Sequence, residues 1–220
     1  MIEQTKYYLQ ILFSAIFAGI CIGLAGFGFL TNPTIGMFLF IFGLSAVVNY
    51  QVKLFTGTAG VLDKVSDIWM LLTCLAGNLI GCYLVSCIAM ASPNELYLSA
   101  ETILMNRINL GWFKAGVMAI GCGILMSASV DFARKGKDFG FWLPLCMGVP
   151  LFILCGFPHC IADAFYYMTC SGQFLLTHLG EALTVYGSIV LGNFIGCNVY
   201  HIKDVIKKDK NDLKKMPLND

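Results

Sequence analysis

Residues 154–163 read Leu-Cys-Gly-Phe-Pro-His-Cys-Ile-Ala-Asp, and they place one histidine, His159, between two long apolar stretches. An ionisable side chain at membrane depth is costly and in most cases functional. Gly156 and Pro158 stand just before this histidine, and both residue types interrupt helices. Irregular backbone is tolerated at this depth where it is buried in protein or lines a water-filled cavity. The stretch therefore predicts an interrupted helix beside a transport pathway.

The composition indicates an integral membrane protein. Of the 220 residues, 58% are hydrophobic and 12% are charged, whereas about a quarter of the residues in a soluble domain are charged. The mean hydropathy of +0.76 agrees with this class. We expect one all-α transmembrane domain over residues 1–202 and a charged cytoplasmic tail over residues 203–220. We expect contact with membrane lipid and no nucleic-acid partner.

The cysteines and histidines predict no metal site, because ten Cys and three His follow neither zinc-site nor haem-site spacing. Most of the cysteines lie inside apolar runs, and we interpret them as small buried hydrophobic residues. We also predict no cofactor and no enzymatic activity. A membrane enzyme would need a nucleophile with its base, or a metal constellation, at one depth, and only His159 and Asp163 qualify.

Six stretches are apolar enough to cross a bilayer, which takes about 20 residues of helix. They are residues 9–30, 35–52, 68–91, 111–130, 139–168 and 179–200. The fifth stretch is long for one straight helix, which fits an interruption near residues 156–159. The sequence thus predicts a bundle of six transmembrane helices.

The basic residues orient these spans. With the N-terminus in the cytoplasm, all but two of the 14 Lys and Arg residues fall on the cytoplasmic side. The two exceptions are Arg107, in the outer loop predicted after the third span, and Lys114, near the outer end of the fourth. Cytoplasmic loops carry an excess of Lys and Arg. We therefore predict a multi-pass protein of the inner (cytoplasmic) membrane with both termini in the cytoplasm.

Two Gly-Asn-x-x-Gly patterns indicate an internal repeat. One covers residues 77–81 in the third span and the other covers residues 192–196 in the sixth. Small residues four apart let helices approach closely. Asn78 and Asn193 take the same place in the two copies, where each can bond across helices or to a broken backbone. Three spans per half would make the second copy inverted in the membrane.

The second span of each predicted half is also interrupted. A Gly- and Thr-rich break at residues 53–60 follows the second span, as the break at His159 interrupts the fifth. Inverted repeats with interrupted helices are an architecture of transporters. We predict an inverted 3+3 repeat whose two breaks face each other near the midplane, bringing Thr56 towards His159.

At these residues the chain resembles the formate/nitrite transporter family. The resemblance covers nearly all of the six-span region, and its clearest elements are Leu54-Phe55-Thr56-Gly57, Gly156-Phe157-x-His159-x-x-Ala162 and the two Gly-Asn-x-x-Gly motifs. It implies an aquaporin-like fold and a homopentamer in which each protomer holds its own pore. It also implies that small monovalent anions pass: formate, nitrite, hydrosulfide or short carboxylates.

The same resemblance implies roles for individual residues. His159 takes the place of the central pore histidine, and Thr56 that of a loop threonine that hydrogen-bonds near it. Leu54, Phe55 and Phe152 match apolar constriction positions on either side.

Several positions depart from the family pattern. Lys53 stands where the family has Glu, Met118 where it has Lys or Arg, and Pro158 where it has Glu. Asp163 replaces an Asn four residues after the histidine, and Gly123 replaces an Asn that many members have in the fourth span. These changes leave the physiological anion open.

The charge departures suggest that the cation of the pore vestibule has moved from position 118 to Lys53. Lys114, one helical turn before position 118, is the rival carrier. The alternative is that Lys53 is an ordinary interfacial lysine whose ammonium reaches water. Asp163 lies one turn after His159. It either orients the imidazole and favours its charged form, or it faces a subunit contact or a backbone donor.

A mechanism follows from the cost of burying charge. A bare anion is strongly disfavoured at the bilayer centre, whereas a weak-acid anion that gains a proton crosses as a neutral molecule. A histidine with an ordinary pKa of about 6.5 titrates in the useful range. We predict a channel or proton-linked transporter with faster uptake at low external pH. The alternative is a pore for neutral solutes such as water, glycerol or urea, against which stand His159 and the missing Asn-Pro-Ala pair of aquaporins.

Overall fold

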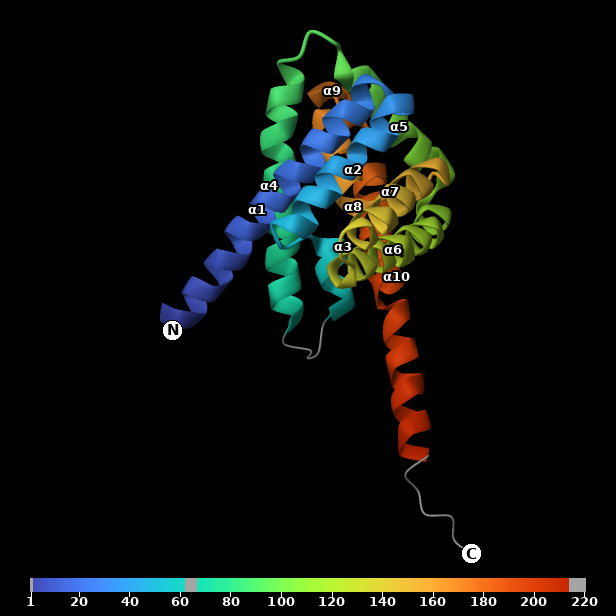
Figure 1. Cartoon of the computed structure of the whole chain (residues 1–220). Coiled ribbons are helices and arrows are strands. Elements are labelled where there is room, and N and C mark those ends of the chain that lie inside the picture. Colours follow the sequence, from blue (N-terminus) through green and yellow to red (C-terminus); the bar gives the residue numbers. More distant parts are fainter. Residues whose placement is uncertain (1, 62–66, 214–220) are drawn as a thin grey trace, which may run out of the picture.

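The computed structural model describes residues 2–61 and 67–213, and over these residues it contains helices and no strand (Figure 1). Four of the described helices hold segments long and apolar enough to cross a membrane. They are α1 (Ile2–Thr31), α4 (Asp67–Met90), α6 (Trp112–Lys135) and α10 (Leu179–Leu213). α10 continues past the boundary predicted at residue 203, so no break separates the bundle from the start of the tail. Residues 214–220 of the predicted tail lie outside the described residues.

Two further apolar helices match the second and fifth predicted spans but are shorter. α2 (Pro33–Asn49) has 17 residues and α7 (Phe139–Leu154) has 16. The start of α2 is encoded locally: the side-chain oxygen of Asn32 accepts the N–H of Ile35 at 3.1 Å. Pro33 takes the first helical position, where its missing N–H leaves no intrahelical hydrogen bond unmade.

A break and a short helix follow each of these two helices. α3 (Phe55–Thr58) and the 3₁₀ turn η1 (Ala59–Val61) come after α2, and α8 (Cys160–Thr169) comes after α7. Gly156 has φ +67°, a left-handed conformation that glycine adopts without steric cost. The predicted interruption of the fifth span near residues 156–159 is confirmed.

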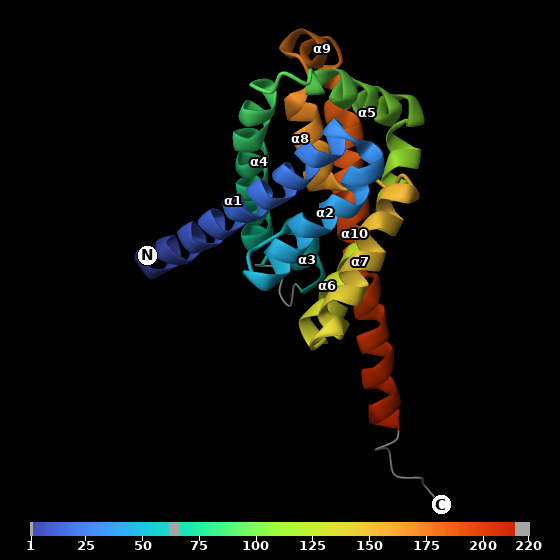
Figure 2. The ribbon, with the colours of Figure 1, turned by 45° about the horizontal axis from the view of Figure 1, so that its top comes forward.

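The segment predicted as an outer loop after the third span is largely helical, which the sequence did not predict. It contains α5 (Leu96–Leu110), a helix of 15 residues. Leu96, Ala100 and Leu104 are buried at four-residue intervals, which puts them on one face of the helix. This face packs towards α8. Figure 2 shows α5 at the same end of the bundle as the short helix α9 (Gly172–Thr177).

Glycines allow the two most extensive helix pairs, α1 with α4 and α6 with α10, to approach closely. A Cβ added at Gly19 of α1 would collide with the backbone carbonyl of Asn78 in α4. A Cβ added at Gly123 of α6 would collide in the same way with the carbonyl of Asn193 in α10. In lipid, helices associate through close van der Waals packing and not through the hydrophobic effect, and small residues at the crossing permit that packing.

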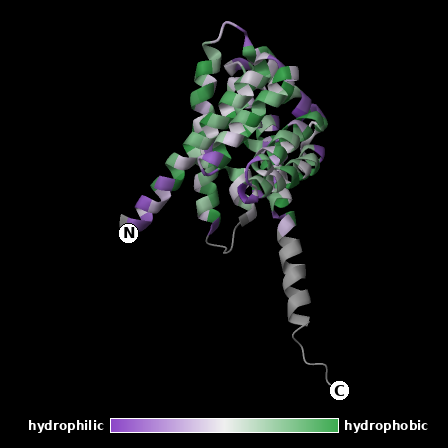
Figure 3. Ribbon diagram, viewed as in Figure 1, coloured by the Kyte–Doolittle hydropathy of each residue, from purple (hydrophilic) through white to green (hydrophobic). Residues whose placement is uncertain are grey.

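The outer surface of the bundle is apolar. Figure 3 shows hydrophobic residues over most of the helical body and hydrophilic ones at the start of α1. Large side chains such as Phe13, Phe42 and Leu183 are more than 60% exposed. Contiguous apolar surface of this kind is rare on soluble monomers and marks contact with lipid or with other protein.

Candidate functional site

One buried asparagine, Asn78 of α4, holds the first helix break together. Its side-chain oxygen accepts the N–H of Phe55 at 2.8 Å. Its amide nitrogen donates to the carbonyls of Ala15 at 2.8 Å and Lys53 at 3.0 Å. Backbone groups at the start of a helix have no intrahelical partner and must be satisfied in a membrane interior. Asn78 therefore satisfies the broken backbone and links it to α1.

Asn193 of α10 makes the same set of contacts at the second break. Its side-chain oxygen accepts the N–H of Cys160 at 2.8 Å. Its amide nitrogen donates to the carbonyls of Ala119 at 2.8 Å and Pro158 at 3.0 Å. The expectation that these two asparagines bond across helices and to broken backbone is confirmed in both halves.

Two cysteines extend the matching pattern. The thiol of Cys82 lies 3.3 Å from the carbonyl of Ile161 in α8, and the thiol of Cys197 lies 3.0 Å from the carbonyl of Thr56 in α3. A thiol is a weak hydrogen-bond donor. Both cysteines are buried, so they pack as small hydrophobic residues while contacting the short helix of the opposite half.

The two breaks meet at Thr56 and His159. The hydroxyl oxygen of Thr56 lies 3.1 Å from Nε2 of His159, although 103 residues separate them in the sequence. Both side chains are buried. The other ring nitrogen, Nδ1, accepts the backbone N–H of Ala162 at 3.2 Å, which caps the start of α8. The predicted approach of Thr56 to His159 is confirmed.

The hydrogen bonds assign the protonation of the ring. Nδ1 of His159 accepts a backbone N–H, so it carries no proton of its own. The imidazole is then neutral, with its proton on Nε2, and Nε2–H donates to the hydroxyl of Thr56. The site therefore has a polar N–H and a hydroxyl side by side in an otherwise apolar core.

Asp163 pairs with Arg107 of α5 and not with His159. Nε of Arg107 donates to Oδ2 of Asp163 at 3.2 Å, and Nη1 donates to the carbonyl of Gly156 at 3.0 Å. The Asp163 side chain is 1% exposed and that of Arg107 is 17% exposed. The prediction that Asp163 orients the imidazole is wrong, because the N–H of Ala162 takes that place.

Burial disfavours a charged guanidinium at Arg107, but the carboxylate of Asp163 outweighs that effect, and the pKa of Arg107 is raised above its ordinary value. The role of Arg107 was not predicted from the sequence, because the segment that carries it was predicted as a loop. Two signals were present: the spacing of Leu96, Ala100 and Leu104 on one helical face, and the buried acid at position 163, which requires a partner.

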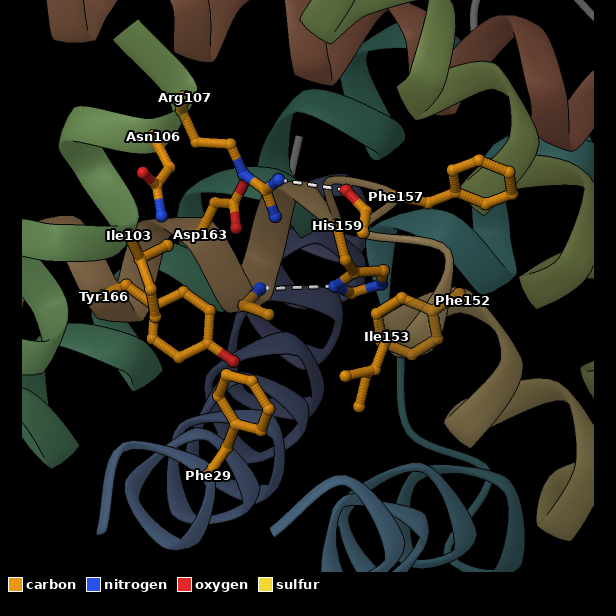
Figure 4. A pocket seen from close by; sticks show the side chains of 12 residues that line it. Phe29, Ile103, Asn106, Arg107, Phe152, Ile153, Phe157, His159, Asp163 and Tyr166 are labelled. Atoms are coloured by element: carbon orange, nitrogen blue, oxygen red, sulfur yellow. Dashed lines mark hydrogen bonds and ion pairs between the residues drawn. The ribbon is translucent and has the colours of Figure 1, made fainter. Parts of the chain in front are cut away.

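A cavity of about 170 Å³ connects these side chains. Figure 4 shows His159 and Phe152 on one side of it, and Arg107 and Asp163 on another. The ring centroids of Phe152 and His159 lie 5.8 Å apart. Tyr166 of α8 also lines it. The cavity thus joins the buried histidine to a cation from α5.

A second hollow, of about 570 Å³, lies at the opposite end of α7. Lys53 and Arg134 both line it, with Phe141 from the start of α7. Lys53 is exposed, whereas the next residues, Leu54 and Phe55, are buried. The cation that lines the His159 cavity is therefore Arg107, while Lys53 faces the other hollow.

The remaining candidate cation, Lys114, is exposed near the start of α6. It lines neither the His159 cavity nor the hollow at Lys53.

This chain is similar in sequence to a protein named as a formate channel. The protein "Formate channel FocA" of Haemophilus influenzae is 26% identical over 181 residues, which are 69% of this chain and 63% of that protein. This chain thus spans less than two thirds of that relative's length.

Two solved structures have a similar fold. One, "Pentameric formate channel with formate bound", has a TM-score of 0.80 at 22% identity and covers 93% of this chain and 98% of its own. The other, "FNT family ion channel", has a TM-score of 0.77 at 16% identity and covers 93% of this chain and 90% of its own. The sequence profile described as "Formate/nitrite transporter" matches residues 2–202. Because that match covers most of the chain, this protein belongs to the formate/nitrite transporter family.

Proposed function

We propose that this protein is a channel or proton-linked transporter that carries small monovalent weak-acid anions across the cytoplasmic membrane. The observation that carries the proposal is the contact between His159 and Thr56, buried where two helix breaks meet inside an apolar bundle. Membership of the family and the relative named as a formate channel support it. The candidate substrates are formate, nitrite, hydrosulfide and short carboxylates.

Apolar residues next to this pair form the proposed barrier. Phe152 lies beside His159, and Leu54 and Phe55 precede Thr56 in the chain; all three apolar side chains are buried. Removing an ion from water costs several kcal/mol or more unless its charge is compensated, and apolar walls offer no compensation. The barrier rejects hydrated ions for this reason.

A proton removes most of this cost. A weak-acid anion that becomes protonated on its way through the cavity passes the barrier as a neutral acid. His159 presents an N–H at this point, shared with the Thr56 hydroxyl. Because the ring is neutral, this N–H donates a hydrogen bond to the anion or polarises a bridging water, and the proton that neutralises the anion comes from the external water. Uptake then rises as external pH falls, because a larger fraction of the substrate carries a proton.

The proposed architecture is an inverted 3+3 repeat with six membrane crossings. The matching contacts of Asn78 and Asn193 support it, because each holds the break of its own half in the same way. In this arrangement α2 with α3, and α7 with α8, form the two interrupted crossings. The high TM-scores to the solved channel structures agree with it.

The proposed orientation has both termini in the cytoplasm, and the proposed assembly is a homopentamer. In Figure 1 the N-terminal end of α1 and the C-terminal end of α10 both point away from the end that holds α5 and α9. The solved structure titled a pentameric formate channel supports the assembly. The apolar outer surface offers contact area for lipid and for neighbouring subunits.

The test is uptake into proteoliposomes. Formate, nitrite, hydrosulfide, acetate and lactate compete with one another at two external pH values, and the His159→Asn variant is measured beside the unaltered protein. We expect uptake of at least one of these anions, faster at the lower pH, and a large loss in His159→Asn. Liposome swelling in glycerol or urea without anion uptake would support the neutral-solute pore instead.

A further inference from the structure

The His159 cavity contains one charged donor whose role is unassigned, the guanidinium of Arg107. We infer that Arg107 receives the anion in the His159 cavity, and that Asp163 positions Arg107 and limits how tightly it holds the anion. The inference rests on the proposed function and names the ligand class: small oxyanions whose oxygens accept hydrogen bonds from a guanidinium. Formate, nitrite and short carboxylates belong to this class, whereas hydrosulfide has no oxygen acceptor.

The guanidinium of Arg107 is held on two sides. Nε donates to Asp163 at 3.2 Å and Nη1 donates to the carbonyl of Gly156 at 3.0 Å. Among the described residues, none accepts a hydrogen bond from Nη2, and Figure 4 shows the guanidinium lying against the cavity that His159 also lines. These bonds use two of the five guanidinium N–H donors. They orient the group and leave Nη2 free to donate to a ligand.

Because Asp163 occupies Nε, the guanidinium should bind an anion weakly, and weak binding favours transport. An arginine with a free fork binds a carboxylate through two parallel hydrogen bonds. Here Asp163 already takes Nε, so an arriving anion cannot use the fork that Nε forms with a terminal nitrogen, and it meets a neighbouring negative charge. Conduction requires a site that attracts the ion and yet releases it. Asp163 therefore lowers the affinity of the site and raises its rate of release.

A purely structural role for the ion pair is the competing explanation, since the pair fastens α5 to α8. However, α5 has a second tie to this region. Glu101 accepts hydrogen bonds from the backbone N–H and the hydroxyl of Ser171, at 3.2 and 2.5 Å. The two explanations differ in what they predict for substrate affinity. An ion pair with a purely structural role affects stability, and its loss leaves the half-saturation concentration of the substrate unchanged.

The experiment measures initial formate uptake against concentration in proteoliposomes of the full chain. Arg107→Gln removes a charge-assisted hydrogen bond, so the half-saturation concentration should rise about tenfold. Arg107→Lys keeps the charge, and its half-saturation concentration should stay within about threefold of the unaltered protein. Hydrosulfide uptake should change less than formate uptake in Arg107→Gln.

Asp163→Asn should shift affinity in the opposite direction. Asn keeps an oxygen that accepts from Nε but removes the negative charge, so both the half-saturation concentration and the maximal rate should fall about threefold. The double variant Arg107→Gln/Asp163→Asn leaves no buried acid unpaired, and it should keep the raised half-saturation concentration of Arg107→Gln. Lys6→Gln, at an exposed position near the start of α1, controls for the loss of one positive charge.

The outcomes are separable. An unchanged half-saturation concentration in Arg107→Gln and in the double variant, with normal uptake by the unaltered protein, overturns the inference and leaves the proposed function standing. No uptake of any of the tested anions by the unaltered protein refutes the proposed function itself. If the Arg107→Gln variants do not reconstitute, Asp163→Asn alone decides, because an unchanged or raised half-saturation concentration there contradicts the inference.

Discussion

The two helix breaks share one backbone arrangement and differ in the side chains that stand at it. Leu54 and His159 each precede a short helix in an extended conformation, with φ −101° and −113°. Leu54 makes no side-chain cap, whereas His159 caps α8 through Nδ1. Asparagines from α4 and α10 hold both breaks identically.

The difference continues further along each short helix. The position four residues after Leu54 is Thr58, and the position four residues after His159 is Asp163. Both are buried. The asparagine contacts around the breaks are therefore structural and common to both halves, while the buried imidazole and the buried acid stand at the second break.

The largest effects should come from removing the two asparagines that hold the helix breaks. Asn78→Leu and Asn193→Leu each remove three hydrogen bonds and leave buried backbone groups unsatisfied, at about 1–3 kcal/mol per group. We expect both variants to lose folded protein to a similar extent. Thermal melting and size-exclusion chromatography of the detergent-solubilised protein measure this loss. If one variant is as stable as the unaltered protein, the two breaks are not held alike.

The next largest effect should come from removing the imidazole at the second break. His159→Asn keeps a side chain that caps the helix but removes the imidazole N–H. We expect normal melting and a drop of at least about tenfold in formate uptake, as for the loss of one hydrogen bond to a charged substrate. Normal anion flux in this variant would show that the difference between the breaks has no role in transport.

A smaller effect is expected from changing Thr56, the residue of the first break that contacts His159. Thr56→Val removes the hydroxyl that contacts Nε2 of His159 and keeps the side-chain shape. Loss of one neutral hydrogen bond corresponds to about a twofold to tenfold change, and we expect formate uptake to fall within that range. Thr56→Ser, which retains the hydroxyl, is the control and should transport like the unaltered protein.

The smallest effects should come from the cations outside the His159 cavity. Lys53→Met removes a charge from the hollow at the other end of α7, and Lys114→Met removes an exposed charge near the start of α6. At physiological ionic strength, charges beyond about 8 Å are largely screened. We expect less than about a twofold change in formate half-saturation for either. A larger change in Lys53→Met would instead favour relocation of the vestibule cation to that lysine.

Much of the fold was predictable because the signals are local. Apolar stretches, the Gly-Phe-Pro break and the paired Gly-Asn-x-x-Gly motifs each depend on neighbouring residues, and they located the long apolar helices and both interruptions. Pairing the two motifs was also sufficient to predict that Thr56 approaches His159. The ends of helices were less accurate: α2 ends at Asn49, three residues before the predicted end of the second span.

The sequence by itself determined the membrane class, the helix breaks and the polar residues at them, because composition and short-range spacing encode these features. The tertiary structure alone decided which groups meet. Arg107 pairs with Asp163 across 56 residues because α5 packs on α8, and the N–H of Ala162, not that acid, takes Nδ1 of His159. A buried acid requires a partner, but only the packing of distant helices determines which cation reaches it.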